Sequence, residues 1–215
     1  MKKFLIFVLC LLLLTACENA PATKTEPKMS TTAASESPLD HEIKRILEKG
    51  VSMVERKRQI PAIETIFRRR TTLNRARQLA TLCYTKTLDT PFLPFDLAEI
   101  ALAETGGHKL SSAAVSSEGA LGVWQLMPKR AKSHGYTPAD MENDEKCAEA
   151  AVRELYTKLE MAQGNLERAK KLYCGQGPEA NYYLRKVHAV RREMQEELEE
   201  HTERLAMGEN ETRTR

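Results

Sequence analysis

Apolar residues recur at helical spacing along most of the chain from residue 40 onward, with polar residues between them. This pattern predicts helices over residues 40–58, 62–83, 95–104, 129–134 and 144–163, a further one after Asn165, and a last one from residue 179 to about 206. Pro61 is expected to end or restart the first helix, because proline removes a backbone donor. The chain is therefore predicted to be mainly α-helical.

Residues 95–104 carry a candidate for acid chemistry. The apolar stripe of this helix, made by Leu97, Ile100 and Ala101, continues at the i+7 position into Glu104. Glu99 is offset from the stripe by about half a turn and is expected to be solvated. Burial raises a carboxyl pKa, so Glu104 suits general acid catalysis. A glutamate that reaches water at a helix end remains an alternative interpretation.

A turn-rich segment follows this helix. Gly119 and Gly122 favour close approach of the backbone to a ligand, and Trp124 beside Gln125 offers an aromatic ring and an amide to a sugar. The two segments together predict an active site.

The sequences ETGG at residues 104–107 and SSEGALGVWQLMP at residues 116–128 resemble the catalytic signature of lytic transglycosylases. These lysozyme-like enzymes cut peptidoglycan, and the GVWQLMP form is most similar to their membrane-bound type D branch. The resemblance covers roughly residues 91–190. It implies that Glu104 acts as acid and base, that Thr105 and Gln125 position the sugar, and that Trp124 and Gly122 shape the groove. It implies no cofactor.

Two later motifs carry the resemblance further. LYCGQGP at residues 172–178 looks like the family's AYNAGPG, so Tyr173 matches a substrate-binding position, while Cys174 replaces the usual asparagine. NYYLRKV at residues 181–187 resembles YV.KV and makes Tyr183 the second candidate catalytic residue. Its phenol is expected to donate to the Glu104 carboxyl, orienting it and tuning its pKa.

The first 16 residues have the pattern of an export signal, with Lys2 and Lys3 before a short apolar run. The ending Leu-Thr-Ala-Cys resembles the site at which bacterial lipoproteins are cleaved and acylated, which makes Cys17 the lipid anchor. Glu18 is not an inner-membrane retention signal of the aspartate type. The expected location is therefore the outer membrane of a Gram-negative cell, facing the periplasm.

The predicted organisation has five parts. A signal peptide at residues 1–16 precedes a lipid-anchored linker at 17–39, a helical extension at 40–90, a lysozyme-like helical domain at 91–190 and a charged helix at 191–215. The end of that helix, residues 208–215, is expected to be disordered.

The charges and cysteines narrow the possible partners. The formal charge of +3 falls to +1 without Lys2 and Lys3, so no nucleic-acid partner is indicated. The sequence has no CxxC pair and no metal-type cluster of histidines and cysteines. In the resembling fold, Cys147 and Cys174 lie on helices that pack together, which makes them a candidate disulfide. The expected partners are peptidoglycan strands and, through Cys17, the membrane; the sequence identifies no protein partner.

Two other functions stay open at this point. A hydrolytic muramidase of the goose lysozyme type would activate water with a further carboxylate, for which Glu118 and Asp96 are candidates. A catalytically weak wall-binding lipoprotein is suggested by Cys174 and by the charged C-terminal helix.

Overall fold

The computed structural model describes residues 53–105 and 108–213, with side chains through residue 207. These residues form helices throughout, with no strand and only isolated β-bridges in the loop before α5. The helices are α2 (Met53–Arg68), α3 (Leu73–Lys86), α4 (Pro94–Thr105), α5 (Pro128–Ser133), α6 (Asp144–Met161), α7 (Leu166–Cys174) and α8 (Pro178–Arg213), with the 3-10 helix η2 (Pro138–Glu142) before α6. The mainly α prediction is confirmed.

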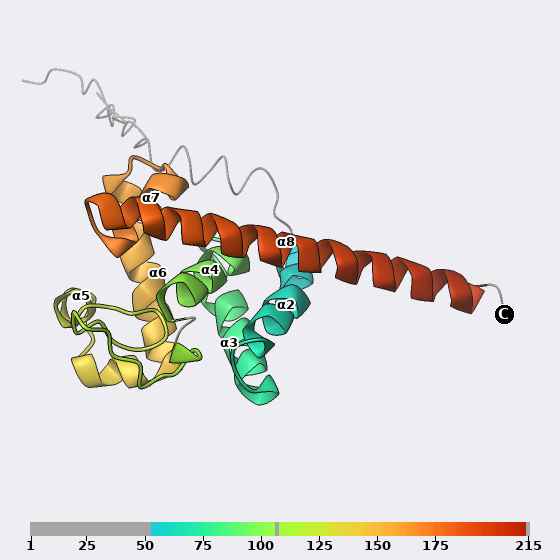
Figure 1. The fold of residues 1–215 in the computed structure, drawn as a ribbon, viewed down its shortest axis with the longest axis horizontal. Coiled ribbons are helices and arrows are strands. Elements are labelled where there is room, and N and C mark those ends of the chain that lie inside the picture. The colour runs from blue at the N-terminus through green and yellow to red at the C-terminus, as the bar shows by residue number, and fades with distance from the viewer. Residues whose placement is uncertain (1–52, 106–107, 214–215) are drawn as a thin grey trace, which may run out of the picture. The chain divides into compact units, whose positions relative to one another are not determined.

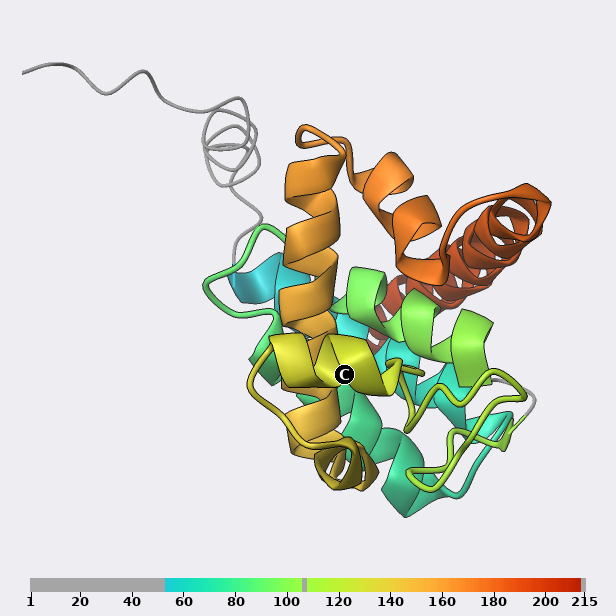
Figure 2. The same ribbon diagram turned by 90° about the vertical axis from the view of Figure 1, so that its left-hand side faces the viewer.

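Helix α4 lies in the middle of this arrangement (Figure 1; Figure 2). Helices α2, α3, α6 and α8 all pack against it, and every residue of α4 except Glu104 is buried. A helix that is buried on all sides keeps no solvated face. Its start is fixed by Asp96, whose carboxylate accepts a hydrogen bond from the Leu93 amide at 2.6 Å.

The N-terminal helix α2 holds the entry to α4. Buried Arg56 donates to the carbonyls of Thr87, Thr90 and Phe92 in the turn before α4. The amide oxygen of Gln59 accepts a hydrogen bond from the Phe95 amide at 3.1 Å, which satisfies a free donor in the first turn of α4.

The expectation that Pro61 ends the first helix is wrong, because α2 runs through it to Arg68. The residues that follow it, Ala62, Ile63, Ile66 and Phe67, have no exposed surface, and this packing outweighs the unfavourable proline. The N-terminal part of that predicted helix, residues 40–52, lies outside the described residues, as do the predicted signal peptide, linker and Cys17.

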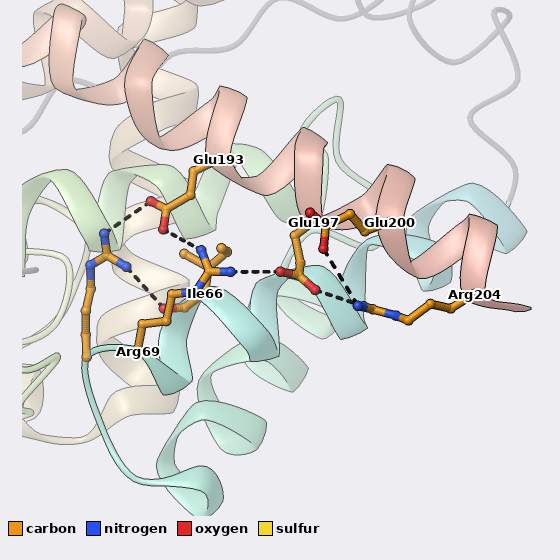
Figure 3. Close-up of polar contacts among 7 residues, drawn as sticks. Ile66, Arg69, Glu193, Glu197, Glu200 and Arg204 are labelled. Carbon is orange, nitrogen blue, oxygen red and sulfur yellow. Dashed lines mark hydrogen bonds and ion pairs between the residues drawn. The ribbon is translucent and has the colours of Figure 1, made fainter.

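Helix α8 passes α4 and then α2 (Figure 1). Arg69, in the turn directly after α2, contacts Glu193 of α8 at 2.8 Å and Glu197 at 2.9 Å (Figure 3). Arg70 in the same turn contacts Glu193 at 3.2 Å. Helix α8 continues to Arg213, so the prediction of disorder is wrong for residues 208–213. In the residues described, no helix has the length and apolar character needed to cross a membrane.

Candidate active site

Glu104 lies in the last turn of α4, where its side chain is largely removed from water. Burial raises the pKa of its carboxyl from 4.5 to about 7, while the Tyr183 hydroxyl and the positive charges of Lys186 and Arg130 act in the opposite direction. A carboxyl with a pKa near neutral has both its acid and its carboxylate form available at neutral pH.

Tyr183 comes to Glu104 from the second turn of α8. Its ring is 5% exposed and packs with Ala103 and Val187 in a small apolar cluster beside the end of α4. The buried hydroxyl makes no hydrogen bond of standard geometry to any described residue. Burial and the charge of Glu104 raise the pKa of Tyr183 well above its usual value. The structure thus brings the two predicted catalytic residues together, with the phenol kept as a neutral donor.

Two cations complete the surroundings of Glu104, and both were missed in the sequence. Lys186 donates from Nζ to the Ala103 carbonyl at 2.8 Å, and Arg130 of α5 donates to the Tyr173 carbonyl at 2.6 Å. Lys186 follows Tyr183 by three residues, so helical spacing alone indicates that both face the same way. No sequence pattern places Arg130 near Glu104, because Arg130 lies in α5, and the position of α5 depends on the path of the loop before it.

The three residues expected to contact sugar face inward instead. Thr105 has no exposed surface. Its Oγ1 lies 2.9 Å from both the Ala101 and the Val123 carbonyl oxygens, and its hydroxyl donates to them. Trp124 is also fully buried, and its indole Nε1 donates to the Leu97 carbonyl at 3.0 Å. Gln125 is 7% exposed and donates from Nε2 to the Gly122 carbonyl at 2.7 Å. In this structure they fix the loop after Glu104 against α4, and none presents a face for a sugar ring.

Gly122 and Tyr173 hold the same loop from its other side. Gly122 has φ +73°, and a Cβ at this position would lie 2.3 Å from the Met141 carbonyl oxygen. Only glycine therefore fits there without displacing backbone. Tyr173 is 2% exposed, and its hydroxyl donates to the Trp124 carbonyl at 2.9 Å. Both residues hold the loop in place from the protein interior, and neither lines the surface of the site.

The prediction that Glu99 is solvated is wrong. Glu99 has no exposed surface, and with Asp96 it forms a buried cluster of four charges with Lys170 of α7 and Arg191 of α8. Lys170 Nζ lies 2.7 Å from Asp96, and Arg191 Nε lies 2.6 Å from Glu99. The two cations hold the pKa of Asp96 well below its usual range against the effect of burial. Asp96 is thereby unsuited to activating water as a base.

The candidate disulfide between Cys147 and Cys174 is not formed, because both thiols are free. Cys147 is buried under the loop, where burial raises its pKa to about 11. Cys174 is exposed at the end of α7, and its pKa is raised by burial of part of the side chain and by the charge of Glu104.

Residues 92–191 match the family model of the transglycosylase SLT domain. The match spans less than half of the chain and supports assignment to the lytic transglycosylase family, whose SLT domain acts on peptidoglycan. No curated protein and no solved structure matches the chain.

The helical architecture is that expected of a lysozyme-like SLT domain. Helices α2 and α3 and the C-terminal part of α8 lie outside the matched residues and pack on its helix α4 or on one another. Among the described residues, no group of three or more histidine, cysteine, aspartate or glutamate side chains has the arrangement of a metal site.

Proposed function

We propose that the SLT domain cleaves the β-1,4 bond between N-acetylmuramic acid and N-acetylglucosamine and leaves a 1,6-anhydro-N-acetylmuramic acid end. The observation that carries this proposal is Glu104, a carboxyl with a pKa of about 7 that lies beside a buried tyrosine hydroxyl and has no ion pair within 4 Å among the described residues. One such group serves a reaction that needs an acid first and a base afterwards.

In the first half of the reaction, the Glu104 carboxylic acid donates its proton to the glycosidic oxygen. The bond from that oxygen to the anomeric carbon then breaks, and its electron pair stays with the departing 4-hydroxyl of N-acetylglucosamine. The charge left on Glu104 is stabilised by the nearby cations Lys186 and Arg130. The Tyr183 hydroxyl is free to donate to the same carboxylate and hold its orientation.

In the second half, the Glu104 carboxylate removes the proton from the 6-hydroxyl of N-acetylmuramic acid. The 6-oxygen forms a bond to the anomeric carbon, which closes the anhydro ring and returns Glu104 to its acid form. No water is consumed, so a second carboxylate is not required. The pairing of Asp96 with Lys170 and Arg191 supports this route over hydrolysis with Asp96 as the base.

The test is mass spectrometry of sacculi digested with the full chain. Fragments lighter than reducing products by one water, absent with Glu104→Gln, are the expected result. Reducing ends would point to a hydrolase, with the exposed Glu118 as the remaining candidate base. Intact sacculi with the protein bound would leave a wall-binding lipoprotein and overturn the proposal.

We further propose that Cys17 carries the lipid that anchors the protein at the outer membrane, facing the periplasm. The support is the sequence pattern of residues 1–17 alone. Metabolic labelling with a palmitate analogue should mark the parent protein and leave Cys17→Ala unlabelled, with Cys83→Ala as the matched control. Equal labelling of Cys17→Ala would contradict the anchor.

A further inference from the structure

Tyr182, the residue before the proposed catalytic tyrosine, is 56% exposed. Within residues 53–105 and 108–207, it is the only exposed side chain among the phenylalanines, tyrosines and tryptophan, since the others are buried or half-buried. An exposed tyrosine offers an apolar ring face and a polar hydroxyl to a ligand, which is why tyrosine is enriched at binding interfaces.

Tyr182 is tied to the end of α4 through Lys186. The Lys186 Nζ lies 5.9 Å from the centroid of the Tyr182 ring and donates to the Ala103 carbonyl at 2.8 Å. Ala103 directly precedes Glu104. The guanidinium of Arg185 also lies over the Tyr182 ring, at 5.6 Å from its centroid. Both cations therefore contact the Tyr182 ring, and Lys186 links this ring to the backbone carbonyl of the residue before Glu104.

The chemistry of the proposed substrate matches this arrangement. A hexosamine ring has an apolar face of C–H groups that packs on an aromatic ring, and its hydroxyls and N-acetyl carbonyl need hydrogen-bond donors. Trp124, the aromatic residue that the sequence indicates for this role, is fully buried and bonded to the Leu97 carbonyl. Tyr182 has both the exposure and the position that Trp124 lacks.

We propose that Tyr182 is a sugar-binding residue of the glycan site, whose ring packs against an N-acetylated hexosamine next to the bond that is cleaved, and that Lys186 is the residue that positions it. This inference rests on the proposed peptidoglycan substrate. It assigns the recognition of the sugar ring to the start of α8 rather than to the loop after Glu104.

Binding is measured in the Glu104→Gln background, where cleavage does not remove the ligand. The full chain, purified in detergent, is sedimented with increasing amounts of sacculi, and the bound fraction gives the affinity. Tyr182→Ala is expected to weaken binding about 3- to 10-fold, while Tyr182→Phe stays within about twofold because it keeps the ring. Lys186→Met is expected to weaken binding as well, and Lys186→Arg to restore it.

The matched control is Leu205→Ala. Leu205 has a similar exposure, 58%, and lies on the part of α8 that is next to α2. It should bind as the Glu104→Gln parent does. Unchanged affinity of Tyr182→Ala, with the parent bound to sacculi, would overturn this inference and leave the proposed function intact. Failure of the Glu104→Gln parent itself to bind would overturn both.

Discussion

The two halves of α4 carry carboxyl groups with opposite electrostatic surroundings. Near its start, Asp96 and Glu99 contact Lys170 and Arg191 directly, and the pKa of Asp96 is lowered. At its end, Glu104 has cations near it but no direct ion pair among the described residues, and its pKa rises to about 7. Burial acts to raise the pKa of both Asp96 and Glu104, so direct contact with cations decides which of these two carboxyls stays ionised.

This difference separates a structural role from a chemical one along a single helix. The paired carboxylates join α4 to α7 and α8, so they hold the helix in place. The unpaired carboxyl is poised between two protonation states.

Replacing the unpaired carboxyl should remove the reaction while leaving the fold intact. Glu104→Gln is expected to lower the rate of release of soluble fragments from sacculi by at least about 10²- to 10⁴-fold, because the acid and base are lost together. The midpoint of thermal unfolding should equal or exceed that of the parent protein, since glutamine keeps the shape of the glutamate side chain without its charge. Glu118→Gln, at an exposed position in the loop, serves as the control and should retain activity. Comparable rates for Glu104→Gln and the parent would rule out the assigned role.

Breaking the paired cluster should have the reverse outcome, a loss of stability. Arg191→Met leaves Asp96 and Glu99 with only Lys170, and an uncompensated buried charge costs about 3 to 5 kcal/mol in the free energy of unfolding. Urea denaturation measures this loss. The control is Arg192→Met, at the exposed next position of α8, with an effect within about 0.5 kcal/mol. If the two methionine variants unfold at the same urea concentration, the cluster is not what holds α4.

Stability should also depend on pH in opposite ways at the two positions. The pKa of Glu104 is about 7 in the folded protein against 4.5 when unfolded, so its stabilising contribution is complete below pH 4.5 and is lost as the pH rises through 7. Between pH 5 and pH 8, the parent should lose about 2 to 3 kcal/mol of unfolding free energy relative to Glu104→Gln.

Asp96 provides the contrast over the same pH interval. Its pKa is lowered on folding, so its contribution is present above the unfolded value of 3.8 and is lost only as the pH falls further. Asp96→Asn should therefore destabilise the protein equally at pH 5 and pH 8. Parallel pH curves for the parent and Glu104→Gln would show that the Glu104 pKa is not raised.

Local periodicity predicts α4 and the burial of Glu104, because both depend on residues within two turns of each other. The same spacing fails for Glu99. Its partners Lys170 and Arg191 lie 71 and 92 positions further along the chain, and only the packing of α7 and α8 on α4 brings them to it. A helix enclosed on all sides has no face that its own sequence marks as solvated.

The loop after Glu104 shows a second limit. Gly122, Trp124 and Gln125 have the composition of a sugar site, and the sequence places them correctly beside Glu104. Composition does not reveal which way a ring points. The Trp124 indole turns inward because the Leu97 carbonyl accepts a hydrogen bond from its N–H. Tyr182 is exposed, although nothing in the helical sequence around it distinguishes it from a buried tyrosine.

The smallest expected effect concerns a cation close to Glu104 but not in direct contact with it. The charge of Lys186 lowers the Glu104 pKa, so Lys186→Met should raise this pKa. The alkaline limb of the pH–rate profile should then move to higher pH by on the order of half a pH unit. Lys186 is exposed, so added salt should reduce the difference between parent and variant. Lys186→Arg keeps the charge and should keep the limb in place. Arg192→Met, at an exposed position further along α8, is the control for general loss of positive charge. An alkaline limb that stays fixed in Lys186→Met would mean that the charge of Lys186 does not reach Glu104, and that burial, Tyr183 and Arg130 set the pKa of this carboxyl.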